Sequence, residues 1–337
     1  MGMHHWAEGP SKPSAQLPAQ PSRLARKERF VLPSLLKARA IRPGDRIAIV
    51  APAGPIDEGR LRAGQRLITE MGFEPVFRPD VLASSGYLAG EDDRRAAELT
   101  QWVADPEVGA IWCARGGYGS SRVLRRLNPV QFREARKPLV GYSDITTLLL
   151  WQRRQAGLMG IHGPMFDLAA QSTTEAAEAL ARALRGIEPR PPTWMGRGLC
   201  GGQAVGRLIG GSLSLSVASL GTPWEIQTRG AIMMLEDVTE PPYRIDRMLD
   251  QLRSAGKFEQ VAGIGLGGMT DCVDSRYPDR DVEAVLVDFF RPLGVPVVLD
   301  LPFGHGDQNR AWPYGGRASI HGDRGELNLL ESAVSTR

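Results

Sequence analysis

The first half of the chain alternates between two patterns of apolar and polar positions. Short apolar runs of strand length, such as RIAIVAP at 46–52, are each followed by a longer stretch in which apolar residues recur every three or four positions. In the stretch 57–73, this spacing places Leu61 and Ile68 on one side of a helix that Gly72 ends. The predicted strands of this half are 46–52, 74–79, 109–115 and 137–143, and its predicted helices are 57–73, 91–105, 120–127 and 144–157.

Strand alternating with helix at this pace predicts a parallel sheet with helices on both faces. The second half of the chain shows the same alternation over shorter and less regular segments. Its predicted strands are 231–238, 261–268, 295–306 and 314–322, and its predicted helices are 242–258 and 279–294. We therefore expect an α/β fold in which a second, smaller α/β domain follows the first.

The boundaries between domains are predicted from changes in composition. Residues 185–206 are dense in Gly and Pro, which is typical of a linker. We predict one domain over 44–190, a linker over 191–206 and a second domain over 207–337. The segment 1–43 is rich in Pro, Ser, Gln and Ala, and we predict that it is a mostly disordered tail.

Positive charge is concentrated in the tail. Residues 1–43 hold eight Lys or Arg against two Asp or Glu, a net +6, while the whole chain is +3, so the body is −3. The body therefore lacks the basic footprint of a nucleic-acid-binding protein. No apolar run approaches the ~18 residues of a membrane span, and no signal-peptide core is evident. We expect a cytoplasmic protein, and its Cys113, Cys200 and Cys272 have no disulfide spacing.

Ser143 stands where a predicted strand meets a predicted helix. In open parallel sheets, ligands bind outside the carboxyl ends of the strands, and KPLVGYSDIT at 137–146 places Ser143 at such an end. The position resembles a nucleophile elbow, although Ile145 departs from the pattern G-x-S-x-G. The simpler alternative is that Ser143 only caps the following helix, with Asp144 complementing the helix dipole.

A serine nucleophile needs a base, and the base needs an acid that orients it. Glu236 and His305 both follow predicted strands of the second half, and the order Ser, Glu, His occurs on α/β folds. His162 follows another strand end and is a competing base. His321, after the last predicted strand, is expected to be exposed.

An acyl-transfer site also needs two N–H groups aimed at the oxyanion. The backbone of Asp144 is one candidate, and the Gly116–Gly117 turn of RGGYG is the other, because glycine lets the backbone approach a ligand closely. RGGYG is also compatible with a phosphate nest, but it lacks the Lys-Ser/Thr of a P-loop. No residues stand at metal-ligand spacing, so we expect neither a metal nor a cofactor.

Seven motifs together resemble those of the LD-carboxypeptidases, serine peptidases of the S66 type. In chain order they are APAGP, RGGYGSSRVL, KPLVGYSDIT, HGPM, GGSLSLSVASLGTPW, LEDVTEPPYRIDRML and FGH. The resemblance runs roughly from Asp45 to Gly322. Because all seven motifs keep the family's order, it is specific.

The resemblance implies an N-terminal flavodoxin-like or glutaminase-like domain, a β-rich α/β C-terminal domain and a homodimer. By motif position, it implies Ser143 as the nucleophile, Glu236 as the acid and His305 as the base, in preference to His162. It also implies two oxyanion donors, the backbone N–H groups of Asp144 and Gly117.

The activity that the resemblance implies is hydrolysis of an L,D-peptide bond, which releases terminal D-Ala from a murein tetrapeptide during peptidoglycan recycling. A second branch, similar to the microcin C immunity peptidases, cleaves the amide between an aminoacyl or peptidyl group and a nucleotide-like group. The segment GDQNRAWPYGGRA at 306–318 departs from a more apolar stretch in the family. A non-catalytic binding protein of the same fold is the rival from another class, and the intact Ser, Glu and His set argues against it.

Overall fold

The computed structural model describes residues 35–166, 174–187, 193–306 and 308–336. The first sheet has the strand order β13-β6-β5-β4-β2-β3. Its strands are β2 (Arg46–Val50), β3 (Glu74–Val76), β4 (Val108–Cys113), β5 (Leu139–Gly141), β6 (Gly160–His162) and β13 (Trp312–Tyr314). All neighbouring strands are parallel except β13, which is antiparallel to β6.

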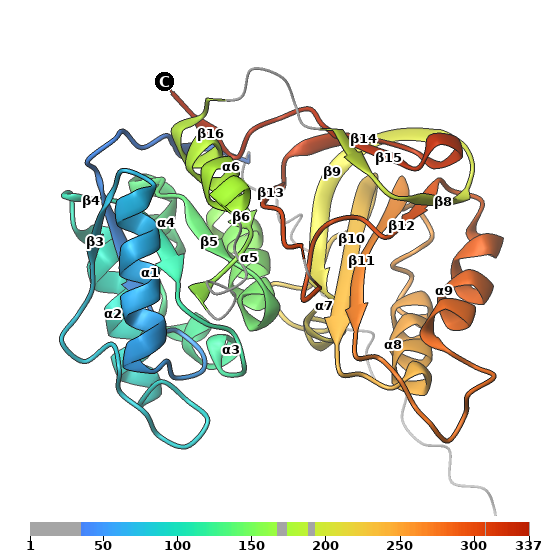
Figure 1. Ribbon diagram of the computed structural model, residues 1–337, viewed down its shortest axis with the longest axis horizontal. Coiled ribbons are helices and arrows are strands. Elements are labelled where there is room, and N and C mark those ends of the chain that lie inside the picture. Colours follow the sequence, from blue (N-terminus) through green and yellow to red (C-terminus); the bar gives the residue numbers. More distant parts are fainter. Residues whose placement is uncertain (1–34, 167–173, 188–192, 307, 337) are drawn as a thin grey trace, which may run out of the picture. The chain divides into compact units, whose positions relative to one another are not determined.

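Helices α1 to α5 of the first half connect these parallel strands, and α6 follows β6 (Figure 1). They are α1 (Glu58–Glu70), α2 (Asp92–Ala104), α3 (Ser120–Val123), α4 (Pro129–Ala135), α5 (Thr146–Trp151) and α6 (Thr174–Arg185). Local sequence explains where two of them begin. The side chain of Asp57 accepts a hydrogen bond from Arg60 N at the start of α1, and Asn128 accepts one from Val130 N at the start of α4.

The second sheet has the order β7-β15-β14-β9-β10-β11-β12-β8. Its strands are β7 (Thr193–Met195), β8 (Arg197–Cys200), β9 (Gln203–Ser212), β10 (Ala231–Val238), β11 (Gly263–Thr270), β12 (Val297–Leu299), β14 (Arg317–His321) and β15 (Glu326–Leu329). Strands β9 to β12 are mutually parallel, and the outer strands pair antiparallel. The helices of this half are α7 (Leu213–Ala218), α8 (Pro242–Ser254) and α9 (Val282–Phe290), with α8 and α9 side by side in Figure 1. The prediction of an α/β fold with a parallel N-terminal sheet is confirmed.

The end of the predicted tail is part of the fold. Strand β1 (Ala38–Arg39) pairs in parallel with β16 (Val334–Ser335), and the side chains of Ala38 and Ile41 are buried. The prediction of disorder over 1–43 is therefore wrong for 35–43, while 1–34 lie outside the described residues. The strand that pairs with β1 is almost 300 residues away in sequence, which no local pattern reveals.

The predicted linker at 191–206 contains β7, β8 and the start of β9. Its glycines serve close packing, because a Cβ placed on Gly198 would lie 1.9 Å from the carbonyl oxygen of Gly322. Strand β13 lies in the predicted second domain but belongs to the first sheet. The domain boundaries remain a prediction.

The register of the first sheet brings the candidate loops to one edge. Val50 is opposite Cys113, and Gly141 is opposite His162. Because these strands are parallel, the segments that follow them leave the sheet at the same edge. The loops after β2, β4 and β5 therefore lie near one another, and Ser143 is in the last of them.

Candidate active site

Ser143 is held in a strained backbone conformation at the end of β5. Its φ is +58°, in the left-handed region that non-glycine residues rarely adopt. The turn is tight, because a Cβ on Gly141 would lie 2.7 Å from Cγ2 of Ile145. Ser143 is the first residue of a 3₁₀ turn (Ser143–Ile145) whose N-cap is Tyr142, so Ser143 is not the helix cap. A strained serine at a strand-to-helix turn is the geometry of a nucleophile elbow.

Asp144 fastens this turn to the glycine-rich loop that follows β4. Its side chain is buried, and its Oδ2 accepts a hydrogen bond from Ser120 N at 2.8 Å. The hydroxyl of Ser120 in turn donates to the backbone oxygen of Asp144 at 2.7 Å. Burial raises the pKa of the Asp144 carboxyl, and the hydrogen bonds from Ser120 oppose that rise.

The glycine-rich loop lies directly against Ser143. A Cβ on Gly116 would be 2.8 Å from Oγ of Ser143 and 3.2 Å from the backbone nitrogen of Asp144. The next glycine, Gly117, has a φ of +91°, and its N–H has no acceptor among the residues described. The carbonyl of Gly116 accepts from Gly54 N at 2.9 Å. Since N–H and C=O point in opposite directions in a trans peptide, the N–H of Gly117 is directed away from Gly54.

Glu236 and His305 are in direct contact. Nδ1 of His305 is 2.7 Å from Oε2 of Glu236, which also accepts the backbone N–H of His305 at 3.3 Å. Glu236 is completely buried on β10, where pairing with β11 shifts register between Leu235 and Asp237. Such a bulge re-aims the side chain at that point of the strand. Gly304, with φ of +101°, permits the contact, since a Cβ there would lie 2.7 Å from Oε2 of Glu236.

The histidine from the second half packs against Tyr142, the residue that precedes the candidate nucleophile. The ring centroids of His305 and Tyr142 are 4.7 Å apart, and Tyr142 immediately precedes Ser143. A second contact joins the halves nearby, where Ser212 N donates to Oγ1 of Thr146 at 3.2 Å. The structure therefore joins Glu236 to His305 and places the His305 ring against Tyr142, the residue before Ser143.

His162, the competing base, is placed differently. It is completely buried at the end of β6, with its ring stacked on Trp312 at 4.7 Å between centroids. Burial, with a smaller contribution from nearby His305, lowers the pKa of His162 to about 3. None of the described residues forms a hydrogen bond with either ring nitrogen. A histidine with so low a pKa and no orienting acid is a poor general base at neutral pH.

The other polar candidates are engaged elsewhere. His321, at the end of β14, is opposite Gln203 and Glu326 in the second sheet. Its ring Nδ1 is 3.9 Å from the carboxylate of Asp323. Cys113 is buried within β4, and burial raises the pKa of its thiol, so it is a core residue and not a nucleophile.

Sequence reasoning missed two buried charges on α2. The side chains of Arg95 and Glu98 have no exposed surface, and each bonds to the backbone of the loop after β2. One signal was present in the sequence: Arg95, Leu99 and Trp102 stand at i, i+4 and i+7, on the stripe that a helix buries. A charged residue on such a stripe indicates a polar partner in the interior.

In the described segments, no three His, Cys, Asp or Glu side chains form a group that could hold a metal ion. No helix in those segments has the length and apolar character needed to cross a membrane.

The sequence matches the LD-carboxypeptidase N-terminal domain over residues 47–163 and the LD-carboxypeptidase C-terminal domain over residues 205–320. The chain belongs to the LD-carboxypeptidase family. It is accordingly a serine peptidase, a hydrolase, as predicted from the seven motifs. The candidate nucleophile Ser143 and its neighbour Asp144 lie in the first matched segment. Glu236 and His305 lie in the second.

Individual members of the LD-carboxypeptidase family align over almost their whole length. A relative from Synechocystis sp., whose name describes a carboxypeptidase without a substrate, is 38% identical over 88% of this chain and 98% of its own. The murein tetrapeptide carboxypeptidase of Pseudomonas aeruginosa is 35% identical over 83% of this chain and 94% of its own. The crystal structure of muramoyltetrapeptide carboxypeptidase from Oxalobacter formigenes, at 27% identity, superposes with a TM-score of 0.75 over 84% of this chain and 97% of that one.

Proposed function

We propose that this LD-carboxypeptidase hydrolyses the L,D-peptide bond at the end of a murein tetrapeptide and releases D-Ala. The observation that carries the proposal is the 2.7 Å contact between His305 Nδ1 and Glu236 Oε2, on a ring that packs against the neighbour of Ser143. The substrate class follows the relative from Pseudomonas aeruginosa, whose name states it.

In the acylation step, Ser143 Oγ attacks the scissile carbonyl carbon while its proton passes to His305. Glu236 holds Nδ1 of His305, so Nε2 is the nitrogen that takes up the proton, and the buried carboxylate stabilises the imidazolium that results. The negative charge moves to the carbonyl oxygen. This assignment uses His305 and excludes His162, whose pKa of about 3 makes it too weak a base.

The backbone N–H groups of Asp144 and Gly117 are the proposed donors to the oxyanion. Asp144 N–H lies in the first turn of a helix, where no preceding carbonyl of that helix can accept it. Gly116, which has no Cβ, leaves space beside Ser143 Oγ and Asp144 N, since a Cβ there would lie 2.8 and 3.2 Å from these atoms, and Gly117 is the next residue of the same loop. The loss of one such donor typically lowers kcat by ~10²–10³.

The intermediate then collapses. The bond between the carbonyl carbon and the D-Ala nitrogen breaks, and His305 gives its proton to that nitrogen. Water attacks the acyl-enzyme, and His305 takes a proton from it. In the second collapse the ester bond to Ser143 Oγ breaks, His305 returns that proton to Oγ, and the tripeptide acid is released. Atoms and charge balance with water as the only co-reactant, so the residues described need no metal or cofactor for this sequence.

The test is a comparison of two substrates and one label. The protein is incubated with murein tetrapeptide and, separately, with an aminoacyl-sulfamoyl adenylate, and the products are separated by chromatography. Release of D-Ala supports the proposal, whereas cleavage of the adenylate alone would assign the chain to the microcin-type branch. A fluorophosphonate probe reports the nucleophile without reference to the substrate, and an unlabelled chain would support a non-catalytic protein.

A matched pair of variants identifies the nucleophile. Ser143→Ala should abolish fluorophosphonate labelling, while Ser121→Ala, in the adjacent helix α3, should leave it unchanged. Continued labelling of Ser143→Ala would place the nucleophile elsewhere.

We also infer, from the family, a homodimer located in the cytoplasm. Light scattering after gel filtration tests the first inference, and a mass near the 36.7 kDa of one chain would contradict it. Fractionation of the native cells tests the second.

A further inference from the structure

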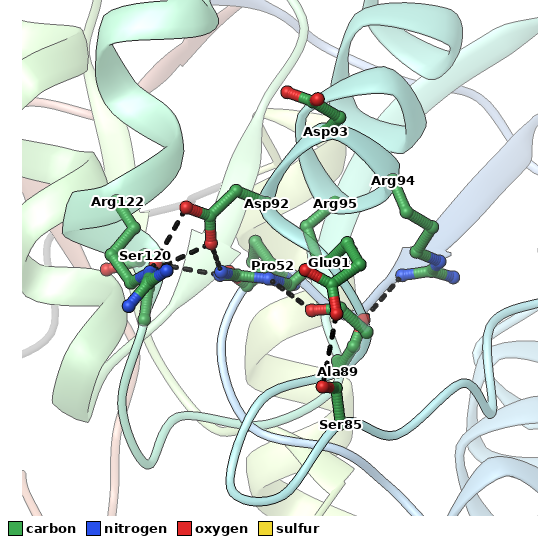
Figure 2. A network of polar contacts seen from close by, with 12 residues as sticks. Pro52, Ser85, Ala89, Glu91, Asp92, Asp93, Arg94, Arg95, Ser120 and Arg122 are labelled. Carbon is green, nitrogen blue, oxygen red and sulfur yellow. Dashed lines mark hydrogen bonds and ion pairs between the residues drawn. The ribbon is translucent and has the colours of Figure 1, made fainter.

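Arg95 is a buried cation at the centre of a polar network beside the active-site loops. It lies on α2, and its side chain has no exposed surface. Isolated charges are strongly disfavoured in a protein interior, so a buried guanidinium persists only where several acceptors surround it. Figure 2 shows the carboxylate of Asp92 between the side chains of Arg95 and Arg122.

The guanidinium of Arg95 joins three segments of backbone. Its Nη1 donates to the carbonyl oxygen of Pro52 at 2.6 Å and to that of Gly119 at 2.7 Å. Its Nε donates to the carbonyl oxygen of Gly90 at 3.2 Å. Pro52 belongs to the loop after β2 and Gly119 to the loop after β4, so one side chain fixes the two loops relative to each other.

Both of these loops continue to the proposed oxyanion donors. On one side, Gly119 is followed by Ser120, whose N–H and hydroxyl hold the side chain and the backbone oxygen of Asp144. On the other side, the loop that begins at Pro52 reaches Gly54, whose N–H binds the carbonyl of Gly116 at 2.9 Å. The peptide between Gly116 and Gly117 carries the second donor.

The shape of Arg95 suits this task. A guanidinium directs several N–H groups in one plane and can bind separate carbonyls at once, which the single ammonium of lysine cannot do with the same geometry. Gly119 is fitted to it, because a Cβ there would lie 2.9 Å from Nη1 and its φ is +126°. Asp92 balances the charge and also pairs with Arg122 and Arg126.

We propose that Arg95 is a positioning residue that sets the directions of the Asp144 and Gly117 N–H groups by fixing the carbonyls of Pro52 and Gly119. The inference rests on the proposed function, since it concerns the oxyanion site of that reaction. Arg95 itself does not touch Ser143. Its effect is on transition-state binding, because the donors meet full negative charge only there.

The test uses Arg95→Met, with Arg136→Met as its matched control. Arg136 also binds a backbone carbonyl, that of Lys37, through Nε and Nη2 at 3.0 and 2.8 Å. Among the described residues, its side chain forms no hydrogen bond with the loops around Ser143. Both variants should melt at a lower temperature than the wild type. Only Arg95→Met should have a lower kcat on murein tetrapeptide. We expect a fall of ~10²-fold with KM nearly unchanged, because the oxyanion donors would be misdirected.

Two further readouts separate positioning from general damage. A boronic-acid analogue of the tripeptide product forms a tetrahedral adduct that uses the oxyanion donors, while the tripeptide itself does not. Arg95→Met should lower the affinity for the analogue by about the same factor by which it lowers kcat. The affinity for the tripeptide should stay nearly unchanged. Equal weakening of both ligands, or a kcat like that of Arg136→Met, would overturn the inference.

The rate of fluorophosphonate labelling shows whether a negative result contradicts the proposed function or only the role of Arg95. A wild type that is not labelled contradicts the proposed function, whereas a labelled wild type with equally fast Arg95→Met contradicts only the role of Arg95. If Arg95→Met does not fold, Ser120→Ala takes its place, because it removes one hydrogen bond from the same connection. Wild-type labelling and kcat in Ser120→Ala would then count against the inference.

Discussion

Gly116→Ala is the sharpest single perturbation of the proposed site. Gly116 is buried, and its φ is outside the left-handed region, so alanine can adopt its backbone without strain. The new methyl group would lie 2.8 Å from both Cβ and Oγ of Ser143 and 3.2 Å from the backbone nitrogen of Asp144. The substitution therefore acts on the nucleophile and on one oxyanion donor with a single carbon atom.

The size of the effect follows from these distances. Ordinary van der Waals contact begins near 3.4 Å, so Ser143 or the loop must move by roughly 0.6 Å to remove the overlap. A displacement of ~1 Å at reacting groups costs ~10²-fold in rate. The methyl also occupies space within 3.2 Å of Asp144 N, where the oxyanion would sit, and losing that donor costs ~10²–10³. We expect kcat to fall by at least ~10², with a melting temperature within a few degrees of the wild type.

The assay is steady-state release of D-Ala from murein tetrapeptide, with thermal melting measured on the same samples. Gly306→Ala is the control, because it also adds a methyl next to His305, the proposed base, but its Cβ would be no closer than 3.8 Å to Oγ1 of Thr270. Full activity in Gly116→Ala would show that the Ser143 side chain does not attack from the position described. A collapse of the melting temperature together with kcat would show instead that Gly116 serves the fold.

Three further predictions address the proposed catalytic residues, the buried acid of α2 and the N-terminal segment. Ser143→Ala and His305→Ala should each lower kcat by ~10³ or more, and the double variant should be little worse, because triad members act as a unit; additive losses in the kinetics would contradict this. Burial raises the pKa of Glu98 from 4.5 to about 7. The folded state therefore holds this proton more tightly, so the contribution of Glu98 to stability is fully present below pH 4.5 and declines by about 3 kcal/mol as the pH rises through 7. Glu98→Gln should flatten that part of the pH profile of urea unfolding, and an unchanged slope between pH 5 and 8 would exclude Glu98 as its source. A chain that begins at Asp45 should melt several degrees below one that begins at Leu35, because Ala38 and Ile41 are buried and β1 pairs with β16; equal melting temperatures would show that these contacts add no stability.

The sequence was sufficient wherever local pattern decides structure. The predicted strand Ala231–Val238 is β10 with the same bounds, because its apolar run is buried on both faces. The corner at Ser143 follows from an apolar run that ends in Gly141 and from the helical spacing that begins at Asp144. Helix α4 was missed although it has the signals of a helix start, an Asn128 cap and Pro129 in the first turn.

Pairings between distant segments could not be predicted from the local sequence pattern. The glycines of the predicted linker fit against Gly322 and Gly325, and that close approach is invisible without the fold. The same holds for Arg95, whose acceptors are backbone carbonyls, which every residue carries and which leave no mark in a sequence. The contact of Glu236 with His305 was predicted because family motifs, and not spacing, connect the two positions.

The antiparallel pairing of β13 with β6 has a consequence for synthesis of the chain. The ribosome makes β6 by residue 162, but its partner at residues 312–314 comes about 150 residues later, which at ~5–20 residues per second is roughly 10–30 s. During that time the nascent first sheet ends in an unpaired strand, and an open strand edge is a template for pairing with another chain. A chaperone that shields this edge, or fast folding of the second sheet, would protect the emerging protein. In the proposed mechanism the base, His305, is made only shortly before β13, so the partly made chain passes through most of this interval without peptidase activity.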